Sequence, residues 1–393
     1  MTRVVSLTPA SLDRDSRTLK QATTVARLGY ASTVVEAQRS AHEVEAAPFD
    51  VVTLRSVGES LADESGAAPD MGRGAVERIA ALLGRVAGPL YFLASWVAFN
   101  LATARRLPPA DLYYLHGYEQ ALAVWLRRTP YVYDAHDLYV ALPHDGRALS
   151  RQERAIHAVR ERIERACIRR AAARVTTSQA MARAYERRFG APFEVVRNAQ
   201  DPRLARAASG DVRAAAGVGD DAFLLVMVAQ HKPGTVVPAE LPEGVHLAFV
   251  GEGYDEVAAG AGERVHFVGA AAPDEIASFI ATADAAALLY VPVTENSPTQ
   301  LVNGLFHAVA AGLPLLVPAR MDAIRELAEE HGLGVVVEPE DPASLAAGVE
   351  ALRAGLDGYR AAVRAAAPAL SWEHEERELA AILERVLGRR RVS

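Results

Sequence analysis

Short runs of β-branched and aliphatic residues alternate with longer amphipathic stretches along this chain, and no other feature limits the fold as strongly. Such a pattern is typical of parallel strands that are connected by helices. Strands are predicted at residues 3–7, 32–36, 50–54, 112–115, 131–134, 174–177 and 194–196, and again at 223–229, 246–250, 265–268, 285–290, 314–317 and 334–337. The sequence therefore predicts an α/β protein with parallel sheets.

The length of the chain indicates more than one domain. It has 393 residues, and single domains cluster near roughly 100–200 residues. The best boundary lies near residues 198–220, where a turn-forming Asn-Ala-Gln-Asp-Pro run precedes an Ala-, Gly- and Asp-rich segment. Each half then carries its own set of strands and is expected to form a Rossmann-like unit.

Composition and missing motifs exclude several classes of function. The net charge of -7 disfavours an electrostatic nucleic-acid binder. Cys167 is the only cysteine, which excludes an intramolecular disulfide and a cysteine-rich zinc site. The chain lacks a nucleophile elbow, a Walker motif, a paired-His zinc helix and a dinucleotide glycine fingerprint. Only Lys20 and Lys232 are lysines, so their positions are informative.

The N-terminus has no signal-peptide core, so we expect a cytoplasmic protein. Residues 86–104 carry no formal charge and are just long enough to span a bilayer. Gly88 and Pro89 interrupt them, and a buried or half-buried helix of a soluble domain is the favoured interpretation. Peripheral contact at the inner face of the membrane is the alternative, for this segment and for the Arg-rich amphipathic helix predicted at 151–172. The Arg-rich residues 389–391 form either a solvated end or another contact with an anionic surface.

In the first half, ionisable residues follow three predicted strands where each strand ends. They are Asp13, Arg14, Asp15 and Arg17 after the first strand, His116 after residues 112–115, and Asp134, His136 and Asp137 at the end of residues 131–134. Because the carboxyl ends of parallel strands meet at one edge of a sheet, these groups are expected to lie together. Converging ionisable groups at such an edge indicate a ligand site, although each residue alone is as readily structural.

In the second half, residues 296–300 read Asn-Ser-Pro-Thr-Gln after a predicted strand. Ser297 is expected to cap a helix over residues 298–311, with Pro298 in its first turn and Gln300 completing a capping box. The free amides and the positive end of the helix dipole would then suit a phosphate. A capped helix without a ligand is the alternative.

Lys232 and two glycines follow the first two strands of this half. Lys232 ends the run Gln230-His231-Lys232 after residues 223–229, and Gly251 and Gly253 come directly after residues 246–250. A compact ammonium group at the carboxyl end of a strand suits a diphosphate. An exposed loop lysine and ordinary turn glycines are the alternatives.

Taken in order, these segments resemble the family 4 glycosyltransferases of the GT-B fold. The resemblance is carried by residues 6–35, by the strand that ends in His116, by Tyr-Asp-Ala-His-Asp at 133–137 and by residues 306–314, which are similar to a Glu-Ala-Met-Ala-x-Gly-x-Pro helix. Residues 303–306, Asn-Gly-Leu-Phe, are similar to the Asn-Lys-Leu-Phe variant of one subgroup. The resemblance covers nearly the whole chain and depends on the order and spacing of the motifs.

The resemblance implies two Rossmann-like domains that face a cleft. Residues 1–200 would bind the acceptor, residues 201–370 the nucleotide sugar, and residues 371–393 would form a helix that crosses back to the N-terminal domain. The implied reaction moves a hexose-like sugar from a nucleotide-diphosphate sugar to a small molecule or glycan precursor, with retention and without a bound metal. The nucleotide sugar is a co-substrate, so no cofactor is expected. The oligomeric state is left open.

The resemblance also implies roles for individual residues. His116 would contact the transferred sugar, and Lys232 would neutralise the diphosphate leaving group as charge develops on it. The donor-binding set would comprise Gln230, His231, Gly251, Gly253, Asn296, Ser297, Thr299, Asn303 and His307. The acceptor side of the cleft would comprise Asp15, Arg17, His136 and Asp137.

The chain departs from the family pattern at the donor side. Thr299 and His307 stand where the family has two glutamates, of which the second holds the ribose, and Glu295 is a candidate substitute for one of them. Gln230-His231-Lys232 replaces a Gly-Arg loop, and Pro238 and Pro242 argue against the usual helix at 235–244. Two alternatives therefore stay open: a catalytically weak GT-B protein that binds nucleotide or supports a partner enzyme, and a sugar-nucleotide epimerase or phosphorylase.

Overall fold

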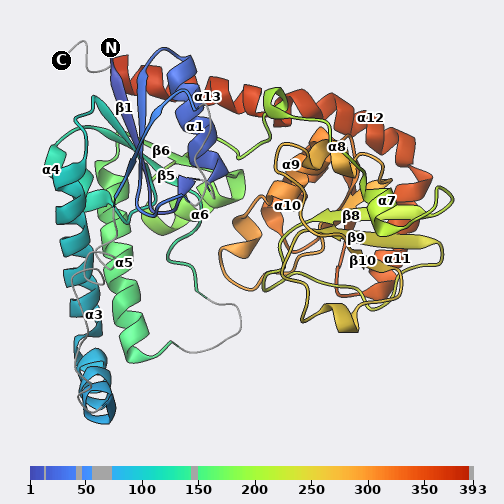
Figure 1. The fold of residues 1–393 in the computed structure, drawn as a ribbon, viewed down its shortest axis with the longest axis horizontal. Helices are drawn as coiled ribbons and strands as arrows, with labels where there is room; N and C mark the ends of the chain where they lie inside the picture. The colour runs from blue at the N-terminus through green and yellow to red at the C-terminus, as the bar shows by residue number, and fades with distance from the viewer. Residues whose placement is uncertain (13–14, 41–46, 55–72, 143–148, 389–393) are drawn as a thin grey trace.

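Two parallel sheets, each covered by helices, form the two halves of the molecule (Figure 1). The computed structural model describes residues 1–12, 15–40, 47–54, 73–142 and 149–388, with residues 73–87 described by their backbone only. Asp13, Arg14 and residues 389–391 lie outside the described residues. The predicted fold class, a pair of Rossmann-like units, is confirmed.

The N-terminal sheet has seven strands in the order β3-β2-β1-β4-β5-β6-β7. Its strands are β1 (Arg3–Thr8), β2 (Ala31–Glu36), β3 (Asp50–Thr53), β4 (Leu112–His116), β5 (Tyr131–Ala135), β6 (Ala173–Thr176) and β7 (Glu194–Val195). Its helices are α1 (Ser16–Arg27), α3 (Arg73–Arg106), α4 (Ala121–Arg127), α5 (Arg151–Arg170) and α6 (Gln179–Phe189). The strand order reverses between β1 and β4, and open α/β sheets bind ligands in the crevice at such a point.

The C-terminal sheet has six strands in the order β10-β9-β8-β11-β12-β13. Its strands are β8 (Phe223–Val228), β9 (Val245–Val250), β10 (Val265–Phe267), β11 (Ala285–Ala287), β12 (Leu315–Pro318) and β13 (Gly334–Val337). The helices are α7 (Val212–Ala216), α8 (Ile276–Ile280), α9 (Asn303–Ala310), α10 (Asp322–His331), α11 (Pro342–Ala354), α12 (Leu356–Ala366) and α13 (Trp372–Gly388). The corresponding crevice lies between β8 and β11.

The predicted helix start at Ser297 is wrong, because α9 begins only at Asn303. Residues 297–299 form a 3-10 turn, and Gln300 has the extended dihedrals φ -83° and ψ 136°, which end it. The hydroxyl of Ser297 accepts hydrogen bonds from the amides of Val293 and Thr294 and therefore caps the preceding loop instead of a helix. Residues 229–244 contain no helix, as the two prolines in that segment predict.

Helix α13 completes the core of the N-terminal sheet from the far end of the chain. Trp372 and Leu379 are fully buried and share one apolar cluster with Val4 and Tyr114. The indole N–H of Trp372 donates to the hydroxyl of Thr24 at 3.1 Å. Figure 1 shows α12 and α13 running from the C-terminal half across to the N-terminal half. The last helix therefore joins both halves.

Lys20 secures the connection between the halves. Its ammonium group donates to the carbonyls of Asn198 and Ala199, at 3.3 and 2.5 Å, and lies 5.1 Å from the ring centroid of Trp372. Burial, with a smaller contribution from the charge of Arg17, lowers the pKa of Lys20 to about 7. This lysine therefore holds α1, the connecting segment and α13 together.

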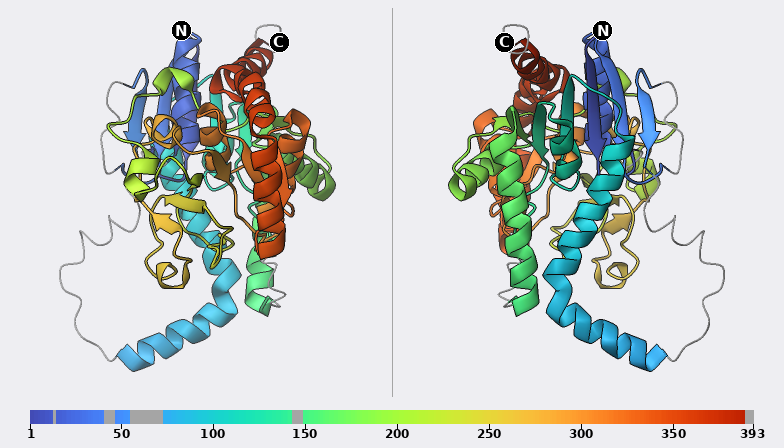
Figure 2. Two further views of the ribbon diagram at one scale, coloured as in Figure 1. Left: turned by 90° about the vertical axis from the view of Figure 1, so that its right-hand side faces the viewer. Right: turned by 90° about the vertical axis from the view of Figure 1, so that its left-hand side faces the viewer.

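Helix α3 is 34 residues long and contains Pro89. Figure 2 shows a bend partway along it, as the missing N–H and the ring of an internal proline predict. Figure 1 shows α3 and α5 side by side, and the N-terminal end of each helix projects beyond the N-terminal sheet. Within the described part of the chain, no helix combines the length and the apolar character needed to cross a bilayer.

Replacing Trp372 by Ala is expected to destabilise the N-terminal half. The substitution removes a fully buried indole from the cluster that α13 shares with the sheet, and such truncations cost about 3–5 kcal/mol. Urea unfolding followed by circular dichroism measures the change. The matched control is Leu126→Ala on α4, where the side chain is 51% exposed and the loss should be small. Equal unfolding midpoints for the two variants would contradict this role of α13.

Candidate functional site

A cavity of about 680 Å³ lies between the two halves and is lined by both. The N-terminal half contributes the start of α1 and the segment that follows β5, with Asp15, Arg17, His136 and Asp137. The C-terminal half contributes the segments after β8 and β9 and the start of α9. The carboxyl edges of the two sheets therefore meet at one cavity, as the placement of polar residues after the strands predicts.

The start of α9 presents its backbone to the cavity. Val302 at the N-cap makes no side-chain hydrogen bond, so the first amides of the helix stay available to a ligand. Gly304 lines the cavity next to Asn303, and a Cβ there would come within 2.6 Å of the carbonyl oxygen of Val228. The glycine lets the helix approach β8 closely and leaves its positive end open to an anion.

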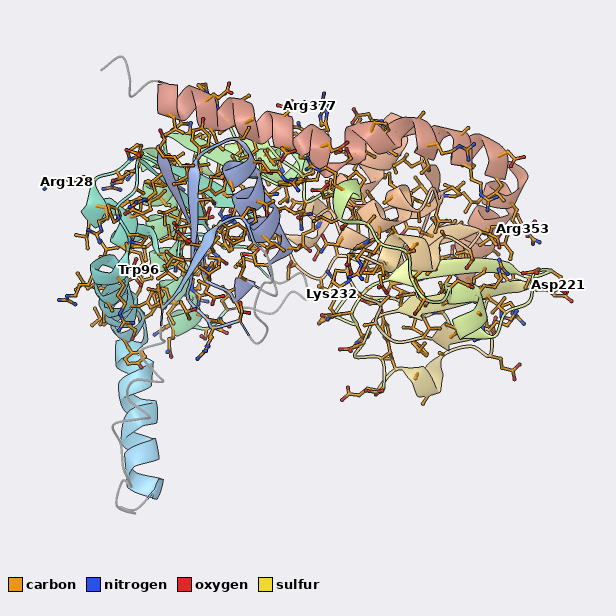
Figure 3. All side chains as sticks on the ribbon, turned by 45° about the horizontal axis from the view of Figure 1, so that its top comes forward. Trp96, Arg128, Asp221, Lys232, Arg353 and Arg377 are labelled. Atoms are coloured by element: carbon orange, nitrogen blue, oxygen red, sulfur yellow. The ribbon has the colours of Figure 1, made fainter. Side chains whose placement is uncertain are left out.

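Lys232 lines the cavity beside this helix start. Its ammonium group lies 5.3 Å from the ring centroid of Tyr290. Partial burial lowers the pKa of Lys232, and the carboxylate of Asp137 opposes that shift. Figure 3 shows Lys232 on the side of the C-terminal half that faces the N-terminal half. A cation and a set of free amides are thus on the same wall of the cavity.

The other residues predicted after β8 and β9 divide into two groups. Gln230 and Gly251 line the cavity, whereas His231 packs its ring on Tyr254 and does not. A Cβ on Gly251 would come within 1.8 Å of the carbonyl oxygen of Ala229, so a side chain is excluded. Gly253 lies outside the cavity lining and has φ +84°, which favours glycine.

Asn296, Ser297 and Thr299 do not line the cavity, and two of them contact the opposite half. The side chain of Asn296 accepts from the amide of Leu138 at 2.7 Å and donates to a carboxylate oxygen of Asp137 at 2.8 Å. The carbonyl of Thr299 accepts from the hydroxyl of Ser178 at 2.5 Å. Gln300, absent from the predicted site, donates to the same Asp137 oxygen at 2.7 Å and does line the cavity.

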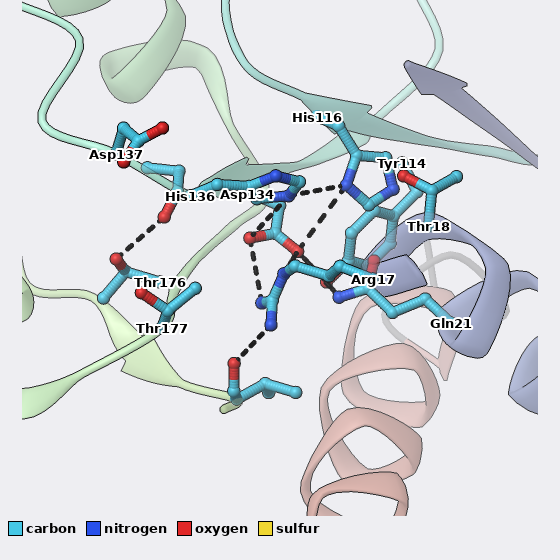
Figure 4. Close-up of polar contacts among 12 residues, drawn as sticks. Arg17, Thr18, Gln21, Tyr114, His116, Asp134, His136, Asp137, Thr176 and Thr177 are labelled. Atoms are coloured by element: carbon cyan, nitrogen blue, oxygen red, sulfur yellow. Dashed lines mark hydrogen bonds and ion pairs between the residues drawn. The ribbon is translucent and has the colours of Figure 1, made fainter. Parts of the chain in front are cut away.

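Arg17 and Asp134 form a buried ion pair below the N-terminal wall of the cavity (Figure 4). Two guanidinium nitrogens donate to the two carboxylate oxygens at 3.0 and 3.1 Å. Gln21 and Tyr114 also donate to Asp134, at 2.7 and 3.0 Å. Burial alone would raise the pKa of Asp134, but the charge of Arg17, the neighbouring imidazoles and the hydrogen bonds from Arg17 together outweigh it and hold that pKa well below its usual range.

His116 and His136 contact each other beside this ion pair. Nδ1 of His116 lies 2.9 Å from Nε2 of His136. His116 is 1% exposed and lies behind the cavity wall, whereas His136 is 24% exposed and is part of the wall. Asp15 caps α1 close by, and although burial opposes it, the imidazoles and the hydrogen bonds from Thr18 lower the pKa of Asp15 to about 2.

His116, Asp134 and His136 are also a candidate metal-binding group by residue type, since their ligand atoms lie within 4.8 Å of one another. Their hydrogen bonds do not fit that use. Both oxygens of Asp134 already accept from the guanidinium of Arg17, and a cation bound there would lie beside that fixed positive charge. The group is better explained as a hydrogen-bonded network.

His307 lines the cavity on α9 and is 6% exposed. Its Nε2 lies 3.2 Å from the amide nitrogen of Gln200, in the segment that connects the halves. Burial, reinforced by the charge of Lys20, lowers the pKa of His307 to about 4, so the ring is neutral near pH 7. Gln200 was not predicted as a site residue. The only sequence signal at this position is the turn-forming run that ends the first half.

Two family models match the chain, one to each half. The model described as "Glycosyl transferase 4-like domain" matches residues 17–199, and "Glycosyl transferases group 1" matches residues 229–354. Together they cover most of the chain and include most of the residues that line the cavity. The two facing Rossmann-like units define the GT-B class of enzyme, and the chain belongs to the GT-B glycosyltransferases. No curated protein matches the chain by sequence.

Solved structures share the fold at low sequence identity. Sucrose-phosphate synthase from Thermosynechococcus elongatus has a TM-score of 0.65 and 16% identity over 99% of this chain and 100% of its own. Anabaena HepE in complex with UDP and glucose has a TM-score of 0.67 and 16% identity over 98% and 100%. WaaG, a glycosyltransferase involved in lipopolysaccharide biosynthesis, has a TM-score of 0.62 and 16% identity over 96% and 99%.

Replacing Asp137 by Ala is expected to loosen the contact between the halves. The carboxylate accepts hydrogen bonds from Asn296 and Gln300 across the cavity, and a hydrogen bond to a charged group contributes about 1.5–3 kcal/mol. Hydrogen exchange at residues 293–300 should accelerate by at least tenfold.

The control for this prediction is Glu326→Gln, which breaks an ion pair between the halves, with Arg183. Both partners are more than a third exposed, and such pairs contribute about 0–1 kcal/mol. Equal exchange at residues 293–300 in both variants would show that Asp137 does not hold this loop.

Proposed function

We propose that this enzyme transfers a sugar from a nucleotide-diphosphate sugar, with the donor on the C-terminal wall of the cavity and the acceptor on the N-terminal wall. The observation that carries the proposal is the pairing of Lys232 with the uncapped start of α9. A diphosphate needs cations and free amides, and this wall supplies both in a chain with a net charge of -7.

The donor phosphates are assigned to Lys232 and the first amides of α9. As the bond between sugar and phosphate breaks, negative charge develops on the leaving diphosphate, and a fixed cation stabilises that charge. Gly304 allows close approach of the backbone, and Asn303 and Gln230 supply further polar contacts from the same wall. Gly251 also lines this wall, where a Cβ would collide with the carbonyl oxygen of Ala229, so the wall carries no side chain at this position.

The ribose is assigned to His307, which stands where the resemblance places a glutamate. A neutral imidazole can donate to a ribose hydroxyl from one nitrogen while the other accepts from Gln200. Glu295, the alternative substitute, is held by the amide of Leu142 and by Arg188, away from the cavity lining. His307 is therefore the stronger candidate.

The acceptor is assigned to the N-terminal wall, where Asp15, Arg17 and His136 lie. It is a small molecule or a glycan precursor, and transfer proceeds with retention and without a bound metal, as the resemblance implies. In that case the charge on the leaving group is balanced by the protein. Lys232 and the helix amides are the groups that do so.

Replacing Lys232 by Ala is expected to weaken UDP binding about 10- to 100-fold and to leave uridine binding unchanged. A hydrogen bond to a charged group contributes about 1.5–3 kcal/mol, and only the diphosphate makes this contact. Calorimetric titration measures the affinity for both ligands. UDP is tested before other nucleoside diphosphates because a HepE structure contains UDP.

Lys232→Arg keeps the charge and serves as the matched control, with affinity for UDP near that of the unchanged protein. Equal losses of affinity for UDP and for uridine would show that Lys232 does not contact the diphosphate. A folded protein that binds none of UDP, GDP, ADP and TDP would refute the donor assignment as a whole.

We also propose that the projecting part of α3 contacts an anionic membrane surface. Leu90 and Tyr91 are 70% and 74% exposed, and Leu101 further along the helix is 41% exposed. Arg160 on the neighbouring α5 lies over the ring of Phe92 at 5.1 Å, so an exposed cation lies beside these apolar side chains. Apolar groups that enter the headgroup region beside arginines are typical of peripheral membrane binding.

A Leu90→Ser/Tyr91→Ser double variant is expected to lose at least tenfold in binding to vesicles of phosphatidylcholine with phosphatidylglycerol. Each buried apolar side chain contributes about 1.5–3 kcal/mol. Co-sedimentation measures the binding, and Leu204→Ser, at a residue 48% exposed elsewhere, is the control. The proposal would be contradicted if the double variant bound the vesicles as tightly as the unchanged protein. It would also be contradicted if binding did not depend on phosphatidylglycerol.

A further inference from the structure

The C-terminal wall of the cavity changes from polar to apolar along its length. Its polar end is Lys232 and the start of α9, assigned above to the diphosphate. His307 lies four residues beyond Asn303 on the same face of α9, about 6 Å further along. Helix α8, which begins at Ile276, packs against α9 (Figure 1). A bound nucleotide therefore meets the helix start with its diphosphate, His307 with its pentose and the α8 side with its base.

His307 offers the pentose a single hydrogen-bonding atom. Its ring is 6% exposed, and its Nε2 lies 3.2 Å from the amide nitrogen of Gln200. An amide nitrogen only donates, so Nε2 accepts and the neutral ring carries its proton on Nδ1. Burial, reinforced by the charge of Lys20, lowers the pKa of His307 to about 4, which excludes a second proton near pH 7. One N–H is left for the ligand.

A single N–H does not distinguish ribose from deoxyribose. Ribose has neighbouring 2′- and 3′-hydroxyl groups, and a side chain that holds both must accept two protons, as a carboxylate can. The other amides nearby do not supply such an acceptor. The Oδ1 atom of Asn303 accepts from Asn198 at 3.1 Å, and the Oδ1 atom of Asn198 is itself buried. The 3′-hydroxyl, which both pentoses carry, is enough to accept from His307.

The side chains that meet the base are apolar. They follow β10 or begin α8, and they are Ala270, Ala271, Pro273 and Ile276. The acidic residues between them, Asp274 and Glu275, do not line the cavity, and Asp274 pairs with Arg206. Among the common bases only thymine has an apolar substituent, its methyl group, on the edge that such side chains can recognise. Burial of that methyl group against them is favourable.

We propose that the sugar donor of this enzyme is a derivative of deoxythymidine diphosphate (TDP). The 3′-hydroxyl of the deoxyribose accepts from Nδ1 of His307, and the thymine methyl group packs on the apolar residues at 270–276. This inference depends on the proposed glycosyl transfer and names the nucleotide that the transfer uses. It adds no covalent step, because it concerns only recognition of the nucleotide. UDP remains a ligand, with lower affinity.

Four ligands test the pentose and the base separately: UDP, 2′-deoxyuridine diphosphate, 5-methyluridine diphosphate and TDP. Calorimetric titration of the full chain measures each affinity. Removal of the 2′-hydroxyl should change the affinity by less than about threefold, with or without the methyl group. Addition of the methyl group should raise the affinity about fourfold on either pentose, the factor expected for burying one such group. A larger loss without the 2′-hydroxyl, or no gain from the methyl group, would overturn the proposal.

A carboxylate at position 307 should create the preference that the histidine lacks. His307→Glu accepts from both hydroxyl groups of a ribose, so UDP should then bind about tenfold or more tightly than 2′-deoxyuridine diphosphate. Lys232→Ala is the matched control, because it weakens both ligands through the diphosphate and leaves their ratio unchanged. An unchanged ratio in folded His307→Glu would show that position 307 does not read the pentose and would overturn the proposal. If His307→Glu does not fold, the four ligands on the unchanged protein still decide.

The outcomes separate this inference from the proposed function. If the unchanged protein binds UDP but loses more than about threefold in affinity without the 2′-hydroxyl, only the choice of nucleotide is wrong. If it binds none of the four ligands, the proposed donor site fails, and this inference fails with it.

Discussion

The buried ion pair between Arg17 and Asp134 organises the functional edge of the N-terminal half. It joins α1 to β5, and a third guanidinium nitrogen donates to the carbonyl of Val196 at the entrance to the connecting segment. Charges at this depth are stable only when they are paired and fully hydrogen-bonded, and removal of one partner typically costs about 3–5 kcal/mol. The pair also keeps Asp134 ionised and occupied, and the two histidines beside it interact with each other instead.

The cavity exists because the two halves are held together at several levels. Helix α13 fills the core of the N-terminal sheet, Lys20 secures the connecting segment, and Asp137 holds the loop before α9. These contacts differ in strength. The apolar cluster around Trp372 is fully buried, whereas the contacts of Asp137 are only partly buried. A GT-B enzyme must admit and release substrates, and the weaker polar contacts of Asp137 are the ones that can open first.

Much of this arrangement could be predicted from the sequence. The strands, the fold class and the clustering of polar residues at the strand ends follow from a period of two or 3.6 residues and from the geometry of parallel sheets. Lys232, Asp15 and His307 were predicted for the site and line the cavity. The helix start at Ser297 was predicted wrongly, because a capping signal is local and the loop is shaped by the hydrogen bonds of Asn296 to the opposite half. The contacts of Gln200 and Gln300 at the cavity were not predicted, since their partners lie more than 100 residues away in the sequence.

The sequence by itself determined two Rossmann-like halves, the family and the edge at which the site lies, because each depends on the order and period of nearby residues. Only the tertiary structure decided which of two histidines faces the cavity, which polar residues hold the halves together and which helix start is left uncapped. The exposure of a side chain and its hydrogen-bond partners depend on which segments pack against each other in the folded protein. Residues that pair between β4 and β5, such as Tyr113 and Tyr131, are 18 positions apart in the sequence, and contacts between the two halves join residues much further apart, so no local pattern encodes the outcome.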